Sequence, residues 1–243
     1  MTERMDDAAH GRTGARTDAS PNARPDFIGD FTGDFETHVT VAAAGPATDT
    51  TLREWAALRG AKYTRILLDA GRTPDQPMLT LRGHGTLTTQ RAAAAAHTAD
   101  LRRAGFDVVR VKIEAAPWNA EVPRTPGEAR ALPPDCYFEH HVKLVLADRA
   151  DIARIAAIGA HHGARVSRNA RRPRPDIGGH ERFVTQRCHR VGRPEARSRL
   201  RLLLRALADA GFQSVEIEQE FVVHDDNPAV DAGWLGTDVG GTR

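Results

Sequence analysis

The sequence predicts an α+β protein of two tandem ferredoxin-like repeats, each with the element order βαββαβ. Three observations support this prediction: the order of the hydrophobic patterns, the return of that order after a proline-rich segment, and polar residues that recur at matching positions. With 243 residues, 40% of them hydrophobic, the chain can bury a core as one large domain or as two domains of about 100 residues each.

The first repeat is predicted at residues 35–116, after a disordered tail at residues 1–34 that lacks hydrophobic periodicity. Alternating hydrophobicity predicts the strands, and stretches that begin at threonine and end at glycine predict the helices between them. The predicted strands are 38–44, 63–69, 78–84 and 108–115, and the predicted helices are 50–60 and 88–105. Together they form one complete βαββαβ unit.

Residues 117–134 contain five prolines and no hydrophobic periodicity, so they are predicted to be a linker. The second repeat is predicted at residues 135–235 and is followed by a flexible C-terminus at 236–243. Its predicted strands are 137–146, 164–170, 182–189 and 214–223, and its predicted helices are 149–162 and 194–210. Pro194 at the start of the last helix and Gly211 after its end fit the residue preferences of helix termini.

Polar residues recur between the two halves at a nearly constant spacing of 103 to 106 positions, which indicates an internal duplication. The matching pairs are His38 and His141, Thr80 and Thr185, Arg82 and Arg187, His84 and His189, and Glu114 and Glu220. Two unrelated units of the same fold would more readily share apolar positions than polar ones. The halves are therefore predicted to be copies of one ancestral repeat.

Strand parity places these polar residues on one face of each sheet, because side chains alternate between the two faces of a strand. The two helices of a repeat must cover the apolar face, so the polar face is predicted to be open. In a sheet with the strand order 4-1-3-2, the start of strand 1 lies near the ends of strands 3 and 4. The sets expected to meet there are His38, His84 and Glu114 in the first repeat, and His141, His189 and Glu220 in the second.

The leading hypothesis from these residues is an enzyme that acts on a small anionic substrate, either phosphorylated or carboxylated, in a cleft between the two open faces. His38 and His141 would serve as acid and base because imidazole titrates near neutral pH. The carboxylates expected to orient or tune the two imidazoles are Glu36, Glu139, Glu114 and Glu220. The groups expected to bind the anion are Arg82, Arg187, Lys143, Thr40, Lys112 and Arg168.

Two alternatives stay open at this point. In the first, each set of two histidines and one carboxylate binds a divalent metal, since these ligand types suit zinc or non-haem iron. The ligands would be His38, His84 and Glu114, or His141, His189 and Glu220. In the second alternative the protein is a non-catalytic ligand-binding or assembly module. The sequence names neither the reaction nor a cofactor, and it does not decide between one site and two.

Composition argues against several classes of partner. The formal net charge is only +2 and no block of like charge exists, which is not the pattern of a nucleic-acid-binding tail. The sequence contains no run of eighteen apolar residues, so no membrane span is predicted. Two cysteines are too few for a disulfide framework, and the first 34 residues lack the apolar region of a signal peptide, so a cytoplasmic protein is expected.

Several strings resemble a family of uncharacterised bacterial proteins of similar length. They are FETHVTV at 35–41, QPMLT at 76–80, IEAAPWN at 113–119, YFEHHVKL at 137–144 and ERFVTQRC at 181–188. The resemblance covers nearly everything after residue 34, and no activity is known for that family. It therefore supports the predicted boundaries of the folded region.

A second, shorter resemblance concerns the polar residues of the first strand. His38-x-Thr40 is similar to one half of the paired H-x-T signature of two-histidine phosphodiesterases. In that family each histidine is an acid or base and each threonine binds a phosphate oxygen. The second repeat departs from the signature, because it carries His141-x-Lys143.

Overall fold

The computed structural model describes residues 30–169, 173–174 and 179–234. The first repeat consists of β1 (Thr32–Val41), α1 (Pro46–Ala57), β2 (Lys62–Leu68), β3 (Asp75–Thr86), α2 (Leu87–Arg103) and β4 (Val108–Ala115). The second consists of β5 (Tyr137–Leu146), α4 (Asp151–His161), β6 (Ala164–Asn169), the short β7 (Pro173–Arg174), β8 (Gly179–His189), α5 (Arg193–Asp209) and β9 (Ser214–Asp225). The predicted α+β architecture of tandem βαββαβ repeats is confirmed.

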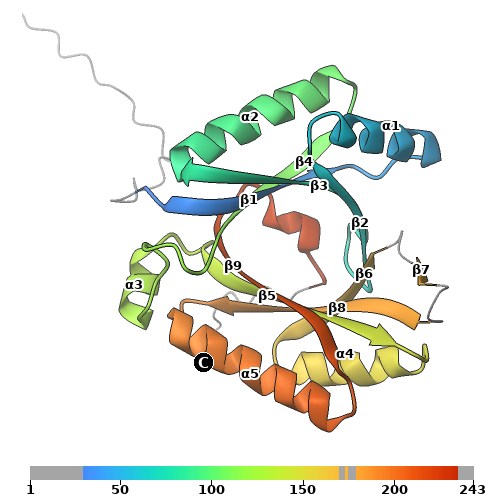
Figure 1. The fold of residues 1–243 in the computed structure, drawn as a ribbon, viewed down its shortest axis with the longest axis vertical. Coiled ribbons are helices and arrows are strands. Elements are labelled where there is room, and N and C mark those ends of the chain that lie inside the picture. Colours follow the sequence, from blue (N-terminus) through green and yellow to red (C-terminus); the bar gives the residue numbers. More distant parts are fainter. Residues whose placement is uncertain (1–29, 170–172, 175–178, 235–243) are drawn as a thin grey trace, which may run out of the picture.

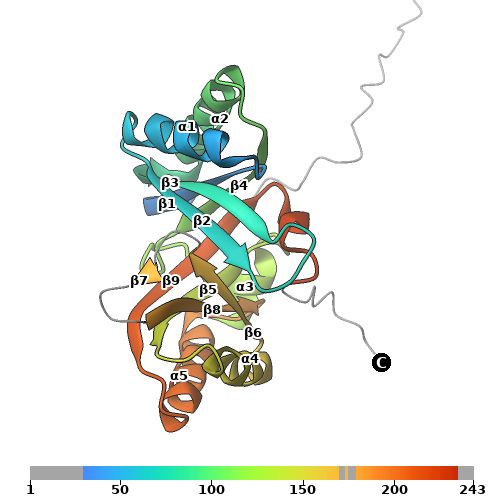
Figure 2. The ribbon, with the colours of Figure 1, turned by 90° about the vertical axis from the view of Figure 1, so that its right-hand side faces the viewer.

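Each repeat forms an antiparallel sheet with the predicted strand order 4-1-3-2. The order is β4-β1-β3-β2 in the first repeat and β9-β5-β8-β6 in the second. The two sheets do not stay separate, because β4 pairs with β9 and β2 pairs with β6. Eight strands thereby close into a single barrel, with α1 and α2 outside one half and α4 and α5 outside the other (Figures 1 and 2).

Barrel closure adds to the prediction that no helix covers the polar sheet faces. The polar faces of the two sheets together form the inside of the barrel. Pairing between the repeats also gives partners to backbone groups at the outer edges of each sheet, which would otherwise be exposed. The central polar residues of both halves therefore face one shared interior.

The apolar faces pack outward against the helices, as strand parity predicts. Val39, Leu79 and Ile113 of the first repeat are fully buried under α1 and α2. In the second repeat α5 buries Leu203 and Leu207 against the sheet, four residues apart on one face of the helix. The molecule therefore has two apolar cores outside the barrel and a polar interior between them.

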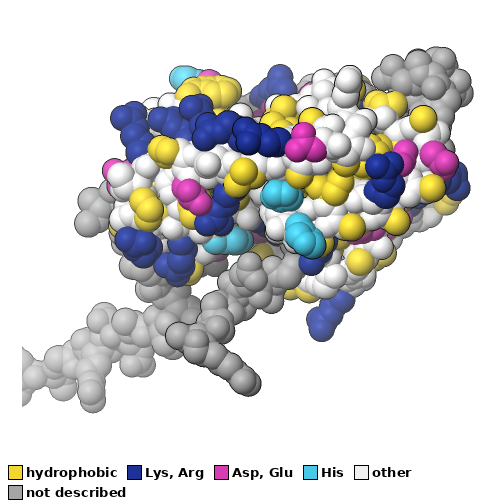
Figure 3. Space-filling view, turned by 90° about the horizontal axis from the view of Figure 1, so that it is seen from below, with side chains coloured by type: hydrophobic (Ala, Val, Ile, Leu, Met, Phe, Trp, Pro, Cys, Tyr) yellow, Lys and Arg dark blue, Asp and Glu magenta, His cyan; other side chains and the backbone are white. Residues whose placement is uncertain are grey.

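The exposed side of α5 is basic. Arg197, Arg201 and Arg205 are exposed and follow one another at intervals of four residues, so they lie along one side of the helix. Figure 3 shows a row of Lys and Arg side chains on the face seen from below. This row is the solvated side of an amphipathic helix.

Several predicted boundaries are corrected by the structure. β1 starts at Thr32, so the end of the predicted tail belongs to the first strand; residues 1–29 of that tail, and the predicted C-terminus at 236–243, lie outside the described residues. The predicted linker contains a helix, α3 (Pro126–Ala131). It forms because Thr125 and Glu128 make a capping box and Pro126 stands in the first turn, where proline is tolerated.

Across the described residues, no helix is both long and apolar enough to cross a membrane.

Candidate functional site

The barrel interior contains a cavity of about 750 Å³. All eight barrel strands contribute lining residues, and α1 and the segment after β9 complete the wall. Apolar and aromatic side chains, among them Tyr63, Met78, Phe183 and Trp234, form part of the lining, and ionisable side chains form the rest. A cavity of this size and mixed character suits a small organic molecule with polar groups.

In the first repeat, His38 has both ring nitrogens engaged. Its Nδ1 lies 3.0 Å from the Thr80 hydroxyl on β3, and its Nε2 lies 2.6 Å from a carboxylate oxygen of Glu114 on β4. The three side chains meet because His38 is the direct cross-strand neighbour of Thr80, and Glu114 projects from the adjoining strand on the same face. Burial alone would lower the pKa of His38, but the charge of Glu114 and its hydrogen bond outweigh burial and raise it.

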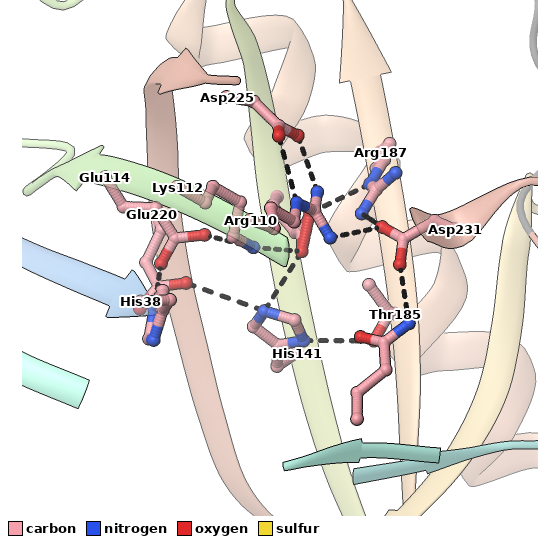
Figure 4. Close-up of polar contacts among 12 residues, drawn as sticks. His38, Arg110, Lys112, Glu114, His141, Thr185, Arg187, Glu220, Asp225 and Asp231 are labelled. Carbon is pink, nitrogen blue, oxygen red and sulfur yellow. Dashed lines mark hydrogen bonds and ion pairs between the residues drawn. The ribbon is translucent and has the colours of Figure 1, made fainter. Parts of the chain in front are cut away.

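The second repeat contains the same arrangement. The Nδ1 of His141 lies 3.0 Å from the Thr185 hydroxyl on β8, and its Nε2 lies 3.5 Å from Glu220 on β9 (Figure 4). An additional carboxylate, Glu139, lies 3.4 Å from the same nitrogen. Burial opposes the charge on His141, but the interactions with Glu139 and Glu220 win and raise its pKa to about 10. Each repeat therefore contributes one Thr–His–Glu unit to the interior.

The two units approach each other because β4 and β9 are paired, with Glu114 directly opposite Val222. Burial, together with the negative charge of Glu114, raises the pKa of Glu220 to about 7 despite the nearby His141. Burial also acts on Glu114, but Lys112 and His38 outweigh it and hold the pKa of that carboxyl well below its usual range. Glu114 therefore stays ionised, whereas Glu220 exchanges its proton near neutral pH.

Cations of the interior are held in ion pairs with carboxylates. The Lys112 ammonium lies 2.5 Å from Glu114 and 3.1 Å from Glu139. Arg187 lies 2.8 Å from Glu139 and 2.6 Å from Asp231, so Glu139 receives both cations (Figure 4). These charges are balanced before any ligand enters.

Most residues predicted for the site do line the cavity. They are His38, His141, Glu36, Glu139, Arg187, Lys143, Thr40, Lys112, Arg168 and Glu220. Glu114 is only 1% exposed and lies behind His38 and Lys112. Arg82 is not among the lining residues; its side chain is 84% exposed and pairs with Glu36 at 2.8 Å. The prediction that Arg82, like Arg187, binds the substrate therefore disagrees with the position of the Arg82 side chain outside the cavity.

The predicted metal sets are wrong in two of their members. His84 pairs with Asp34 on the exposed end of β1, four residues from His38, and His189 packs its ring against Tyr137, four residues from His141. Four residues along a strand correspond to about 13 Å. Parity had placed these histidines on the correct face, but the register of the strands separates them from the centre.

Two other groups of carboxylates and histidines come close enough to share a cation. One is Glu36, His38 and Glu220, and the other is Glu114, Glu139 and His141, with donor atoms within 4.8 Å of one another in each group. In the second group the Lys112 ammonium already contacts both glutamates. In the first group the Nε2 of His38 is already bonded to Glu114. In each group at least one of the possible metal ligands is therefore already engaged by another side chain of the protein.

A part of the interior outside the main set of predicted site residues comes from the chain after β9. Asp231, in the 3-10 helix η1 (Pro228–Asp231), binds Arg110 at 2.9 Å and Arg187 at 2.6 Å (Figure 4). Arg110 also forms a two-pronged ion pair with Asp225. Strand parity predicts that Arg110 lies on the interior face, but no role was predicted for this residue. No pattern in the sequence indicates that the loop containing Asp231 folds back onto the barrel.

Neither a protein-family model nor a curated protein matches this chain. Solved structures resemble it distantly. The regulatory subunit of aspartate kinase from Thermus thermophilus is 12% identical, with 73% of this chain and 95% of that chain covered and a TM-score of 0.32. The small subunit of acetolactate synthase from Thermotoga maritima is 16% identical, with 76% and 92% covered and a TM-score of 0.29.

An unknown protein from Galdieria sulphuraria is 20% identical, with 79% of this chain and 99% of that chain covered and a TM-score of 0.25. Resemblances this distant carry no information about function, which has to be inferred from the site itself.

Proposed function

We propose that the protein is an enzyme that binds a small polar molecule in the barrel cavity and transfers protons to or from it. The observation that carries this proposal is the Thr–His–Glu unit, present once in each repeat. The His–Thr distance is 3.0 Å in both units, and the His–Glu distance is 2.6 Å in the first and 3.5 Å in the second. The two units meet at neighbouring carboxyl groups, one of which, Glu220, lines the cavity.

Glu220 is the proton-transfer group in this proposal. Its side chain is 15% exposed and faces the cavity, and its pKa of about 7 keeps both the acid and the base form populated at neutral pH. A carboxyl group with a pKa near the working pH is suited to general acid–base catalysis. Glu220 therefore takes the role that sequence reasoning gave to the histidines.

His141 acts as a positioning residue. Its pKa of about 10 keeps it positively charged at neutral pH, where it lies between Glu139 and Glu220. The Thr185 hydroxyl fixes the ring from the other side. The imidazolium thereby orients Glu220 and favours its ionised form.

An anionic group of the substrate would bind most readily at Lys143 and Arg168. Lys143 has two carboxylate partners: Glu216 at 3.2 Å, whose side chain is 52% exposed, and Glu181 at 3.5 Å, whose side chain is 1% exposed. Of these two ion pairs, the one with Glu216 is in contact with water. An ion pair in contact with water is weak and easily exchanged. Lys112 and Arg187, by contrast, are deeply buried among carboxylates and would stabilise charge on the protein itself.

The test begins with a thermal-shift screen of phosphorylated and carboxylated small molecules, followed by a turnover assay of those that bind. Glu220→Gln is expected to reduce kcat by about 10²- to 10⁴-fold, the usual contribution of a general acid or base, while the thermal shift persists. Glu218→Gln is the matched control, because Glu218 lines the cavity two residues away on the same face. Unchanged kcat in Glu220→Gln would rule out the assigned role.

A second candidate function is a ligand-binding module without catalysis. It is favoured by the internal ion pairs, which hold the interior side chains in place without needing a substrate. A molecule that binds and is recovered unchanged, with equal affinity for the Glu220→Gln variant, would support this candidate. Metal analysis of the purified protein, with and without Glu36→Gln, tests the metal alternative at the group of Glu36, His38 and Glu220.

A further inference from the structure

The lining of the cavity is divided between two walls of different character. Around the barrel, β1, β4, β9 and β5 are consecutive neighbours, and β3, β2, β6 and β8 make up the other half. We call the first group of strands the polar wall and the second the apolar wall. Among the described residues, every one that the polar wall contributes to the lining is ionisable, except Thr40. Glu220, His38 and His141 all belong to this wall.

The apolar wall supplies all of the large apolar side chains that the barrel strands bring to the cavity. They are Tyr63, Ile66, Leu68, Met78 and Phe183. Ile66, Met78 and Phe183 are partly exposed although they point into the barrel, so they keep surface in contact with the cavity. The strand that carries Ile66, β2, is four strands away from β9 in either direction. It therefore faces Glu220 across the barrel.

Two of these apolar side chains occupy equivalent positions in the repeats. Met78 and Phe183 match at the spacing of 105 that also relates Thr80 to Thr185. Each lies two residues before the threonine of its Thr–His–Glu unit, about 7 Å away along the same face of the strand. Both halves of the protein therefore place an apolar side chain beside the polar unit.

We propose that the substrate of this enzyme carries an apolar group, a ring or a branched chain, next to its anionic group, and that the apolar group lies against the apolar wall. This inference rests on the proposed function and names the class of its substrate. Lys143 links the two walls, because its ammonium lies 5.9 Å from the centre of the Phe183 ring and the two residues are directly opposite each other on β5 and β8. An anionic group bound by Lys143 therefore places the adjoining part of the molecule beside Phe183.

The two walls fix the orientation of such a molecule. Contact of its apolar group with Ile66, Met78 and Phe183 removes apolar surface of both partners from water, which favours binding. The same group on the polar wall would remove water from charged side chains without replacing their hydrogen bonds, which is costly. The apolar group therefore turns toward β2, and the polar part of the substrate faces Glu220.

A sugar phosphate fits the two walls less well. Hydroxyl groups surround a sugar ring, so some of them would lie against the apolar wall. The side chains of Ile66, Met78 and Phe183 offer these hydroxyls no hydrogen-bond partner, and burial of a polar group without a partner disfavours binding. An apolar ring with the same anionic group has no such cost.

Isothermal titration calorimetry with two matched pairs of probes tests the inference on the full chain. Phenyl phosphate is compared with glucose 1-phosphate, and benzoate is compared with glucuronate. The members of each pair share the anionic group and a ring of the same size, and they differ in the polarity of that ring. In at least one pair the apolar member is expected to bind about tenfold more tightly or better. Equal affinities, tighter binding of the sugar members, or binding of none of the four probes would overturn the inference.

A substitution on the apolar wall shows whether this wall makes the contact. Met78→Gln introduces an amide at nearly constant side-chain length and is expected to reduce the preference for the apolar probe about tenfold. Leu202→Gln is the matched control, because Leu202 is 52% exposed on α5 and does not line the cavity. It should keep the wild-type preference. An unchanged preference in Met78→Gln, with the fold intact by circular dichroism, would contradict the assigned wall; the wild-type titrations decide the inference if this variant does not fold.

The titrations do not depend on turnover, so they separate this inference from the proposed function. A preference for the apolar probes that persists in Glu220→Gln supports the substrate class whatever the kcat of that variant. Loss of turnover in Glu220→Gln without any preference among the probes would leave the proton-transfer role standing and overturn the substrate class alone.

Discussion

His38 and His141 have equivalent partners but different surroundings. Each lies 3.0 Å from a threonine hydroxyl, yet the glutamate two residues earlier on the strand is 29% exposed in the first repeat and 2% exposed in the second. Buried Glu139 adds a second carboxylate to His141. One duplicated unit therefore has two different electrostatic environments, and of its two carboxyl groups Glu220 lines the cavity whereas Glu114 does not.

The raised pKa of Glu220 predicts a pH dependence of stability. A carboxyl group whose folded pKa is raised from 4.5 to about 7 contributes fully below pH 4.5 and loses that contribution as the pH rises through 7. From pH 5 to pH 7 the loss is about 2 kcal/mol of unfolding free energy. Urea unfolding at both pH values should show this loss in the wild type and not in Glu220→Gln.

Glu218→Gln is the control for that experiment, since it removes a carboxyl group from the same strand and face. It should keep the pH profile of the wild type. A wild-type profile in Glu220→Gln would contradict the assignment.

Removal of the buried cation Lys112 is predicted to lower stability strongly. Its ammonium contacts Glu114 and Glu139, which are 1% and 2% exposed, so Lys112→Met leaves two buried carboxylates without this counter-charge. Loss of one partner of a buried ion pair costs about 3–5 kcal/mol. Urea unfolding measures the change in free energy.

Arg82→Met is the comparison variant, because Arg82 is 84% exposed and its partner Glu36 is 29% exposed. It is expected to cost about 1 kcal/mol or less. Equal losses in the two variants would show that burial of the partners does not decide the cost.

At the scale of elements, the segment that follows β9, residues 226–234, depends on Asp231. Its carboxylate accepts hydrogen bonds from Arg110, Arg187 and Gln76, which belong to three different strands. Asp231→Asn is expected to lower stability by about 3 kcal/mol. It should also shift the emission of Trp234 to longer wavelength, because that indole is buried only while the segment is docked.

Asp226→Asn tests whether the effect is specific to Asp231. Asp226 accepts from the backbone N–H of Val111 through an oxygen that asparagine also provides. This variant should leave Trp234 emission unchanged. A red shift in both variants would mean that any loss of negative charge in the segment releases it.

At the scale of the whole molecule, the continuous sheet predicts a single unfolding transition. β4 and β9, and β2 and β6, join the repeats by strand pairing, so neither half can unfold without breaking the sheet of the other. Leu203→Ala in α5 removes a fully buried side chain and is expected to cost about 2–5 kcal/mol. Trp55, buried in the first repeat, should report the same lowered midpoint.

The measurement uses a background in which Trp118 and Trp234 are changed to phenylalanine, so that fluorescence comes from Trp55 alone. Circular dichroism follows both repeats together. A Trp55 transition that stays at the wild-type midpoint while the circular dichroism transition moves would show that the repeats unfold independently.

Local patterns allowed much of the fold and part of the site to be predicted. Alternation along a strand depends only on neighbouring residues, so it correctly placed Val39 in the core and His38, Glu114, His141 and Glu220 on the interior face. The helix α3 was missed because its prolines suggested a linker, although Thr125 and Glu128 form a capping box. That signal was local and present in the sequence.

The duplication, the strand order within each repeat and the face of each polar residue could be predicted from the sequence, because these features follow from periodicity and from matching positions. Contacts between distant strands set which of these residues meet. Register between strands separates His84 from His38, and pairing of residues more than one hundred positions apart, such as Lys112 with Asp225, closes the barrel. Burial inside that barrel then sets the pKa of Glu220. Glu220 is desolvated, and Glu114 comes close to it, only once the two repeats have joined.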